Sequence, residues 1–160
     1  MVKAGKIWGV RLKPLQVFTD DRGLVAEVLR CDDEFFGAEF EQFGQTTLTM
    51  SYPGVIKAFH WHRHQDDAWL VVRGMIQAVL HDLRTDSPTQ GVTETYYLGD
   101  HNRQLLVIPR GVAHGYRVLG HEPAWIVYHT TSPYHPQDPD EQRIPFDDPG
   151  IGFDWTTRPR

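Results

Sequence analysis

The stretch FHWHRHQDDAW, residues 59–69, holds three histidines and two aspartates within eleven positions. If the stretch begins in a β-strand, successive side chains point to opposite faces, so His60 and His62 share one face while Phe59 and Trp61 share the other. Two imidazoles on one face can converge on a single point. The stretch therefore indicates a metal site, a proton-transfer site or a polar turn rich in histidine, and the surrounding sequence has to separate these readings.

Short apolar or β-branched runs recur on both sides of this stretch, such as LVAEVL (24–29), QTTLTM (45–50) and AWIVYHTT (124–131). Turn signals such as YPG (52–54) and PRG (109–111) separate them. About ten short strands at close spacing, with no long helical periodicity, are typical of an antiparallel sandwich or barrel. The sequence therefore predicts an all-β fold.

Two segments interrupt this pattern. DDEFFGAEF (32–40) is the one helix candidate, although it is short and contains a glycine. After Tyr134 the chain becomes rich in Pro, Asp and Gly, and we expect it to wrap around the barrel. At 160 residues the chain is long enough for one sizeable core, so we expect a single domain over residues 1–160.

Composition excludes several classes of function. A formal charge of -5 with no basic run argues against nucleic acid as a partner. Apolar runs such as LLVI (105–108) fall far short of the roughly 20 residues that span a bilayer, and the N-terminus has no apolar region typical of a signal peptide. Cys31 is the single cysteine, which excludes an intramolecular disulfide. We therefore expect a cytoplasmic protein that is not associated with a membrane.

The spacing of residues around the opening stretch resembles the two motifs of the cupin barrel, with Asp67 in place of the usual glutamate. The motif positions fall on Gly54, His60, His62, Asp67 and Gly74, and on Pro109, Gly111 and His114. The resemblance implies a cupin fold, a jelly-roll or double-stranded β-helix barrel. It also implies one divalent metal ion held by His60, His62, Asp67 and His114. Such ligands suit Fe, Mn, Ni, Cu or Zn, and the spacing does not choose among them.

Six further segments resemble, in order, the dTDP-4-dehydrorhamnose 3,5-epimerase family of cupins. They are FTDDRGLVAEVLR (18–30), PGVIKAFH (53–60), DLRTDSPT (82–89), IPRGVAHGYRVL (108–119), YHTTSPYHP (128–136) and IPFDDPGIGFDW (144–155). The resemblance implies an isomerase that epimerises a dTDP-linked 4-keto-6-deoxy sugar through an enolate, in deoxysugar biosynthesis. It also implies a homodimer in which N-terminal strands cross between subunits.

The same resemblance assigns roles to individual residues. His60 corresponds to the base, Tyr128 to the acid, and His114 to a histidine that helps to stabilise the enolate oxygen. The positions that hold the nucleotide diphosphate and sugar fall on Arg22, Glu27, Gln45 and Lys57. Tyr134 falls on an aromatic residue that packs against the base, and Glu141 on an acid near it. Lys57 replaces an arginine of the family, which keeps the charge and loses the bidentate fork.

Three departures from the family pattern stand out. Asp67 replaces a lysine that assists enolate stabilisation, and His62 stands where the family usually has Gln. The aspartate that orients the catalytic histidine follows the DW motif in the family, whereas the sequence ends at DWTTRPR. We therefore expect His60 to find another orienting partner.

The substitutions at His62 and Asp67 are also those that complete the metal set, which creates a competition for His60. A ligating imidazole has its lone pair committed, so a His60 that binds metal is not free as a base. A bound ion could instead polarise a ketone as a Lewis acid. Besides the epimerase, two alternatives remain open: a metal-dependent cupin enzyme acting on another small substrate, and a catalytically inactive cupin that binds a sugar nucleotide.

Overall fold

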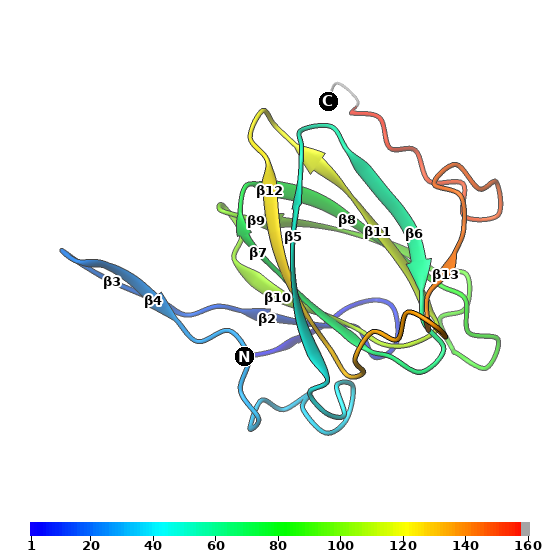
Figure 1. The fold of residues 1–160 in the computed structure, drawn as a ribbon, viewed down its shortest axis with the longest axis horizontal. Coiled ribbons are helices and arrows are strands. Elements are labelled where there is room, and N and C mark those ends of the chain that lie inside the picture. The colour runs from blue at the N-terminus through cyan, green and yellow to red at the C-terminus, as the bar shows by residue number, and fades with distance from the viewer. Residues whose placement is uncertain (158–160) are drawn as a thin grey trace.

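The computed structural model describes residues 1–157, which form β-strands joined by turns and loops (Figure 1). Those residues contain no helix, and so no apolar helix of membrane-spanning length. The strands are β1 (Lys3–Ala4), β2 (Arg11–Pro14), β3 (Val17–Asp20), β4 (Gly23–Ala26), β5 (Gln45–Ser51), β6 (Ile56–Trp61), β7 (Asp67–Arg73), β8 (Met75–Asp82), β9 (Thr93–Gly99), β10 (Gln104–Ile108), β11 (Val112–Leu119), β12 (Ala124–Thr130) and β13 (Gln142–Arg143).

The strands form two large antiparallel sheets and a separate hairpin. The order is β1-β2-β10-β7-β12-β5 in the six-stranded sheet and β13-β6-β11-β8-β9 in the five-stranded sheet, and β3 pairs only with β4. The main core contains Trp69 and Ile126 from the first sheet and Ile76 and Val118 from the second, so it lies between the sheets. This arrangement confirms the predicted all-β jelly-roll.

Period-two alternation places the two faces of β6 as the sequence predicts. Phe59 is fully buried and packs with Val79, Ala113 and Trp155 on the outer side of the five-stranded sheet. The C-terminal segment covers this side, and its strand β13 pairs antiparallel with β6, with Arg143 opposite His60. The expected wrap of the chain around the barrel is therefore confirmed.

The helix predicted for residues 32–40 is wrong, because this segment folds into successive turns. Gly37 has φ of 80°, a left-handed conformation that ends any helix, and its N–H donates to the carbonyl of Phe40 at 2.8 Å. Phe35 and Phe40 are nonetheless buried against Leu70 on the outer face of the six-stranded sheet. Apolar residues in this segment reflect docking onto the sheet rather than helical periodicity.

The β3–β4 hairpin extends away from the barrel (Figure 1). Its large apolar side chains are exposed: Val17, Phe18, Leu24 and Val25. An isolated two-stranded hairpin is marginally stable in water, so this one needs a surface to pack against.

Candidate functional site

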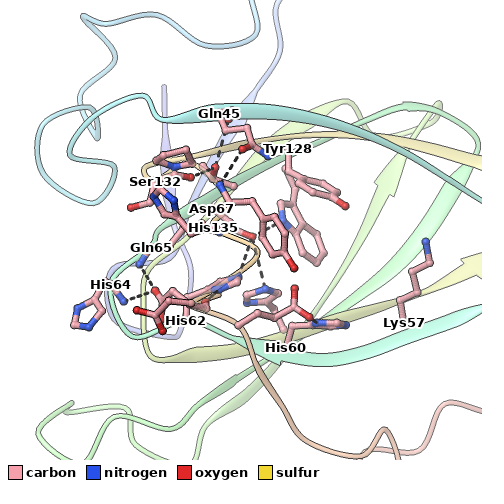
Figure 2. A pocket seen from close by; sticks show the side chains of 18 of the residues that line it. Gln45, Lys57, His60, His62, His64, Gln65, Asp67, Tyr128, Ser132 and His135 are labelled. Atoms are coloured by element: carbon pink, nitrogen blue, oxygen red, sulfur yellow. Dashed lines mark hydrogen bonds and ion pairs between the residues drawn. The ribbon is translucent and has the colours of Figure 1, made fainter.

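A cavity of about 470 Å³ opens at one end of the barrel, between the two sheets and the C-terminal segment (Figure 2). Its lining side chains are Gln45, Lys57, His60, His62, His64, Gln65, Asp67, Trp69, His114, Tyr116, Tyr128, Thr130, Ser132, Pro133, Tyr134, His135, Asp138, Asp140 and Glu141. The volume lies within the range of ordinary small-molecule sites, and the cavity gathers histidines, carboxylates and tyrosines. It is the strongest candidate for the functional site.

His60 contacts a carboxylate that directly precedes β13, the strand that pairs with its own. Its Nδ1 lies 3.0 Å from Oε1 of Glu141, and both side chains are 30% exposed. Burial alone would raise the pKa of Glu141, but the hydrogen bond from Arg143 and the charge of His60 hold it below its usual value. An ionised carboxylate on Nδ1 fixes that nitrogen as the protonated one and leaves Nε2 as the basic atom.

Tyr128 lines the cavity from the opposite sheet. It lies on β12, and its ring packs near the indole of Trp69 at a centroid distance of 6.1 Å. Partial burial raises the pKa of its phenol above the ordinary value, so the hydroxyl keeps its proton at neutral pH. His60 and Tyr128 therefore approach the cavity from different sheets, one as a potential base and the other as a potential acid.

Three other predicted residues form a buried cluster in the cavity wall: His62, Asp67 and His114. Nε2 of His62 lies 3.9 Å from Oδ2 of Asp67, and Nε2 of His114 lies 3.7 Å from the same oxygen. Burial lowers the pKa of His114 to about 4 despite the charge of Asp67. Of the four metal ligands predicted from the sequence, the structure brings these three together, while His60 turns its Nδ1 to Glu141.

The C-terminal segment also fixes the loop that follows β6. The Asp140 carboxylate accepts hydrogen bonds from the backbone N–H groups of Arg63, His64 and Gln65 at 2.8 to 3.1 Å. The backbone carbonyl of Asp140 accepts a further hydrogen bond from Nδ1 of His62. Although partial burial alone would raise the pKa of Asp140, the N–H groups of Arg63 and His64 hold it below its usual range.

The residues predicted to bind substrate separate into two groups. Gln45, Lys57 and Tyr134 line the cavity, where the backbone N–H of Tyr134 donates to Oε1 of Gln45 at 2.9 Å. Arg22 and Glu27 do not line it: Arg22 lies in the turn of the β3–β4 hairpin, with its side chain 85% exposed and paired with Asp20, and Glu27 follows that hairpin.

Sequence reasoning placed Glu141 near the base but did not identify it as the partner of His60. It also missed Asp140, and missed Gln65 and Trp69 as the donors that hold Asp67. The available signal was the pair of adjacent acids at 140–141 in a segment expected to wrap around the barrel.

Known proteins resemble this chain over most of its length. A family model described as dTDP-4-dehydrorhamnose 3,5-epimerase matches residues 4–160. The spore coat polysaccharide biosynthesis protein SpsL of Bacillus subtilis is 54% identical, with 93% of this chain and 96% of the relative covered. The probable low-salt glycan biosynthesis epimerase Agl13 of Haloferax volcanii is 40% identical, with 93% and 94% covered.

A solved structure shows the same fold. It is a dTDP-6-deoxy-D-glucose-3,5-epimerase from Legionella pneumophila in complex with dTDP-4-keto-L-rhamnose. The TM-score is 0.85 and the identity 29%, with 97% of this chain and 82% of the other covered. This likeness confirms the cupin-type fold predicted from the sequence.

The Asp140 contacts generate a prediction about stability. Asp140→Ala leaves three N–H groups without their acceptor, so we expect the free energy of unfolding to fall by about 1 to 3 kcal/mol in urea denaturation at pH 7. Asp138→Ala, at an exposed position in the same segment, is the control. Because the pKa of Asp140 is lowered in the folded state, its contribution is present above the unfolded pKa of about 4 and is lost as pH falls through the folded value. An equal loss in both variants would contradict this role.

Proposed function

Because the chain belongs to the dTDP-4-dehydrorhamnose 3,5-epimerase family, a family of isomerases, we propose that it epimerises a dTDP-linked 4-keto-6-deoxy sugar. The ligand named for the Legionella pneumophila structure supports this substrate class. The names of the two relatives, which refer to spore coat polysaccharide and glycan biosynthesis, support a role in supplying deoxysugars to polymers.

One observation carries the proposal: a histidine on the five-stranded sheet, paired with a carboxylate of the C-terminal segment, lines the same cavity as a protonated tyrosine on the six-stranded sheet. A 4-keto group acidifies the neighbouring C–H bonds, so epimerisation needs a base on one face of the sugar and an acid on the other. Nε2 of His60 removes the proton, Glu141 stabilises the imidazolium that forms, and Tyr128 returns a proton from the opposite side. Neither transfer calls for a metal ion.

The remaining cavity residues suit the rest of the substrate. Lys57 Nζ lies 3.2 Å from Thr49 Oγ1 at the edge of the cavity, and in the proposal it meets a phosphate as a single positive charge. Gln45 and Tyr134, already joined by a hydrogen bond, form a wall against which the sugar packs. In the proposal His114 faces the 4-keto oxygen, and its Nε2 is the ring nitrogen left free because Nδ1 contacts the carbonyl of Val112.

We further propose a homodimer in which the β3–β4 hairpin packs on a second copy of the chain. The exposed Phe18, Leu24 and Val25 supply an apolar surface that the hairpin alone cannot bury. In this arrangement Arg22, which does not line its own cavity, reaches the nucleotide in the partner's cavity, and Glu27 supports it there. The single domain over residues 1–160 and the cytoplasmic location remain predictions.

Proton exchange tests the reaction itself. Incubated with dTDP-4-keto-6-deoxyglucose in deuterated water, the protein should introduce deuterium at C3, C5 or both, detected by NMR. His60→Asn should slow exchange by at least about 100-fold because the base is lost. His121→Asn, at an exposed site outside the cavity, should exchange at the normal rate. No incorporation by the unmodified protein counts against epimerase activity on this sugar.

The role of Glu141 predicts a loss in kcat. Glu141→Gln keeps the size of the side chain but removes the charge that stabilises the imidazolium, so we expect kcat to fall by about 100- to 10,000-fold with little change in KM. Glu141→Asp should recover part of that loss, and Glu122→Gln, an exposed acid elsewhere, should lose nothing. If kcat/KM falls by the same factor because KM rises while kcat is unchanged, Glu141 has a binding role instead.

Mixing of variants tests the crossing hairpin. Arg22→Ala and His60→Asn homodimers should each be poorly active, but a heterodimer has one cavity with both residues intact. After co-refolding at equal amounts, we expect about a quarter of the normal activity, because half the dimers are mixed and each has one working site. Activity no higher than the mean of the two parent variants would mean that Arg22 does not act across the interface.

A further inference from the structure

The cluster of His62, Asp67 and His114 presents three ligand atoms to one another inside the cavity wall. Their ligand atoms all lie within 4.8 Å of one another, and the two Nε2 atoms lie 3.7 and 3.9 Å from Oδ2 of Asp67 (Figure 2). Bonds of about 2.0 to 2.2 Å around one ion place neighbouring ligand atoms roughly 3 to 3.6 Å apart. The two imidazole–carboxylate distances exceed that range by a few tenths of an ångström, whereas the cluster as a whole spans up to 4.8 Å, so a bound ion would draw the ligands together.

Backbone carbonyls fix which nitrogen of each imidazole faces the cluster. Nδ1 of His114 lies 3.0 Å from the carbonyl of Val112, and Nδ1 of His62 contacts the carbonyl of Asp140. A carbonyl oxygen only accepts, so each Nδ1 carries the proton and each neutral imidazole presents the lone pair of Nε2. Metal-ligating histidines usually donate their second nitrogen to a carbonyl or carboxylate in the same way.

Asp67 is a buried carboxylate whose direct hydrogen-bond donors are neutral. Its side chain is 6% exposed, and it accepts from the Gln65 amide at 2.8 Å and from the Trp69 indole at 3.1 Å. Among residues 1–157 no lysine or arginine lies within ion-pair distance of it. A buried negative charge beside two lone pairs is costly unless a positive charge compensates it.

We propose that His62, Asp67 and His114 bind one divalent cation of the first transition series. Two imidazoles and one carboxylate suit Zn²⁺, Fe²⁺, Mn²⁺, Co²⁺ or Ni²⁺ better than Mg²⁺ or Ca²⁺, which prefer oxygen ligands. When bound, such an ion supplies positive charge to a ketone or enolate oxygen in the cavity.

His60 lies outside this set, because among the described residues the group of ligand atoms within 4.8 Å of one another comes from His62, Asp67 and His114. The base and the ion can therefore occupy the cavity together, which removes the competition that the sequence suggested. The assigned role of the ion rests on the proposed epimerase function, whereas binding of the ion does not.

Binding is tested with the metal alone. Protein stripped with a chelator and dialysed is titrated with Zn²⁺ by calorimetry and with Co²⁺ by visible absorption. We expect about one equivalent per chain, and a rise in Tm with Zn²⁺ because the ion binds only the folded cluster. His62→Gln and Asp67→Asn should weaken binding by about 100-fold or more, while the exposed His101→Gln should bind normally.

The readouts separate this inference from the epimerase proposal. Less than a tenth of an equivalent of bound ion and an unchanged Tm would overturn the metal site, as would equal binding by His62→Gln, Asp67→Asn and His101→Gln. Circular dichroism checks that each variant is folded, and the Tm shift of the unmodified protein needs no variant. Deuterium exchange without metal binding would overturn the metal site and support the epimerase. One equivalent of bound ion without deuterium exchange would support the metal site and count against the epimerase.

Discussion

The pairing of β13 with β6 is the contact on which the site depends. Two residues of β13, opposite Trp61 and His60, bring the preceding acids to the end of β6. Glu141 then meets the His60 imidazole, while Asp140 accepts from three N–H groups of the loop and from the His62 ring. A short antiparallel ladder thus sets the orientation of both histidines, and charge on the two acids is maintained by the donors around them.

The two sheets contribute different chemistry to one cavity. The five-stranded sheet carries His60 and His114, while the six-stranded sheet carries Asp67 and Tyr128. Because a jelly-roll holds its sheets face to face, groups on opposite sheets can act on opposite faces of a flat intermediate. The same packing buries His114, which lowers its pKa and favours the neutral ring.

Sequence reasoning succeeded where the signal was local. Alternation along residues 59–62 predicted which side chains face the cavity. The resemblance to the cupin motifs implied that His60, His62, Asp67 and His114 converge, and the structure groups the last three of them. Sequence reasoning was limited where the contact spans the chain: the partner of His60 lies 81 positions away, and only strand pairing reveals it. It failed at residues 32–40 because apolar spacing alone does not distinguish a helix from turns that dock onto a sheet. For Arg22, the predicted binding role depends on a second chain.

The changes at His62 and Asp67 relative to the family pattern are linked by electrostatics. A lysine at position 67 would bring its own positive charge to the cavity wall, whereas an aspartate reverses the sign and needs compensation there. Histidine at position 62 adds a second lone pair that faces the same carboxylate oxygen. Without a cation this contact is repulsive, whereas around a cation the three groups act together as ligands. The two substitutions therefore suit the proposed cation at the centre of the cluster.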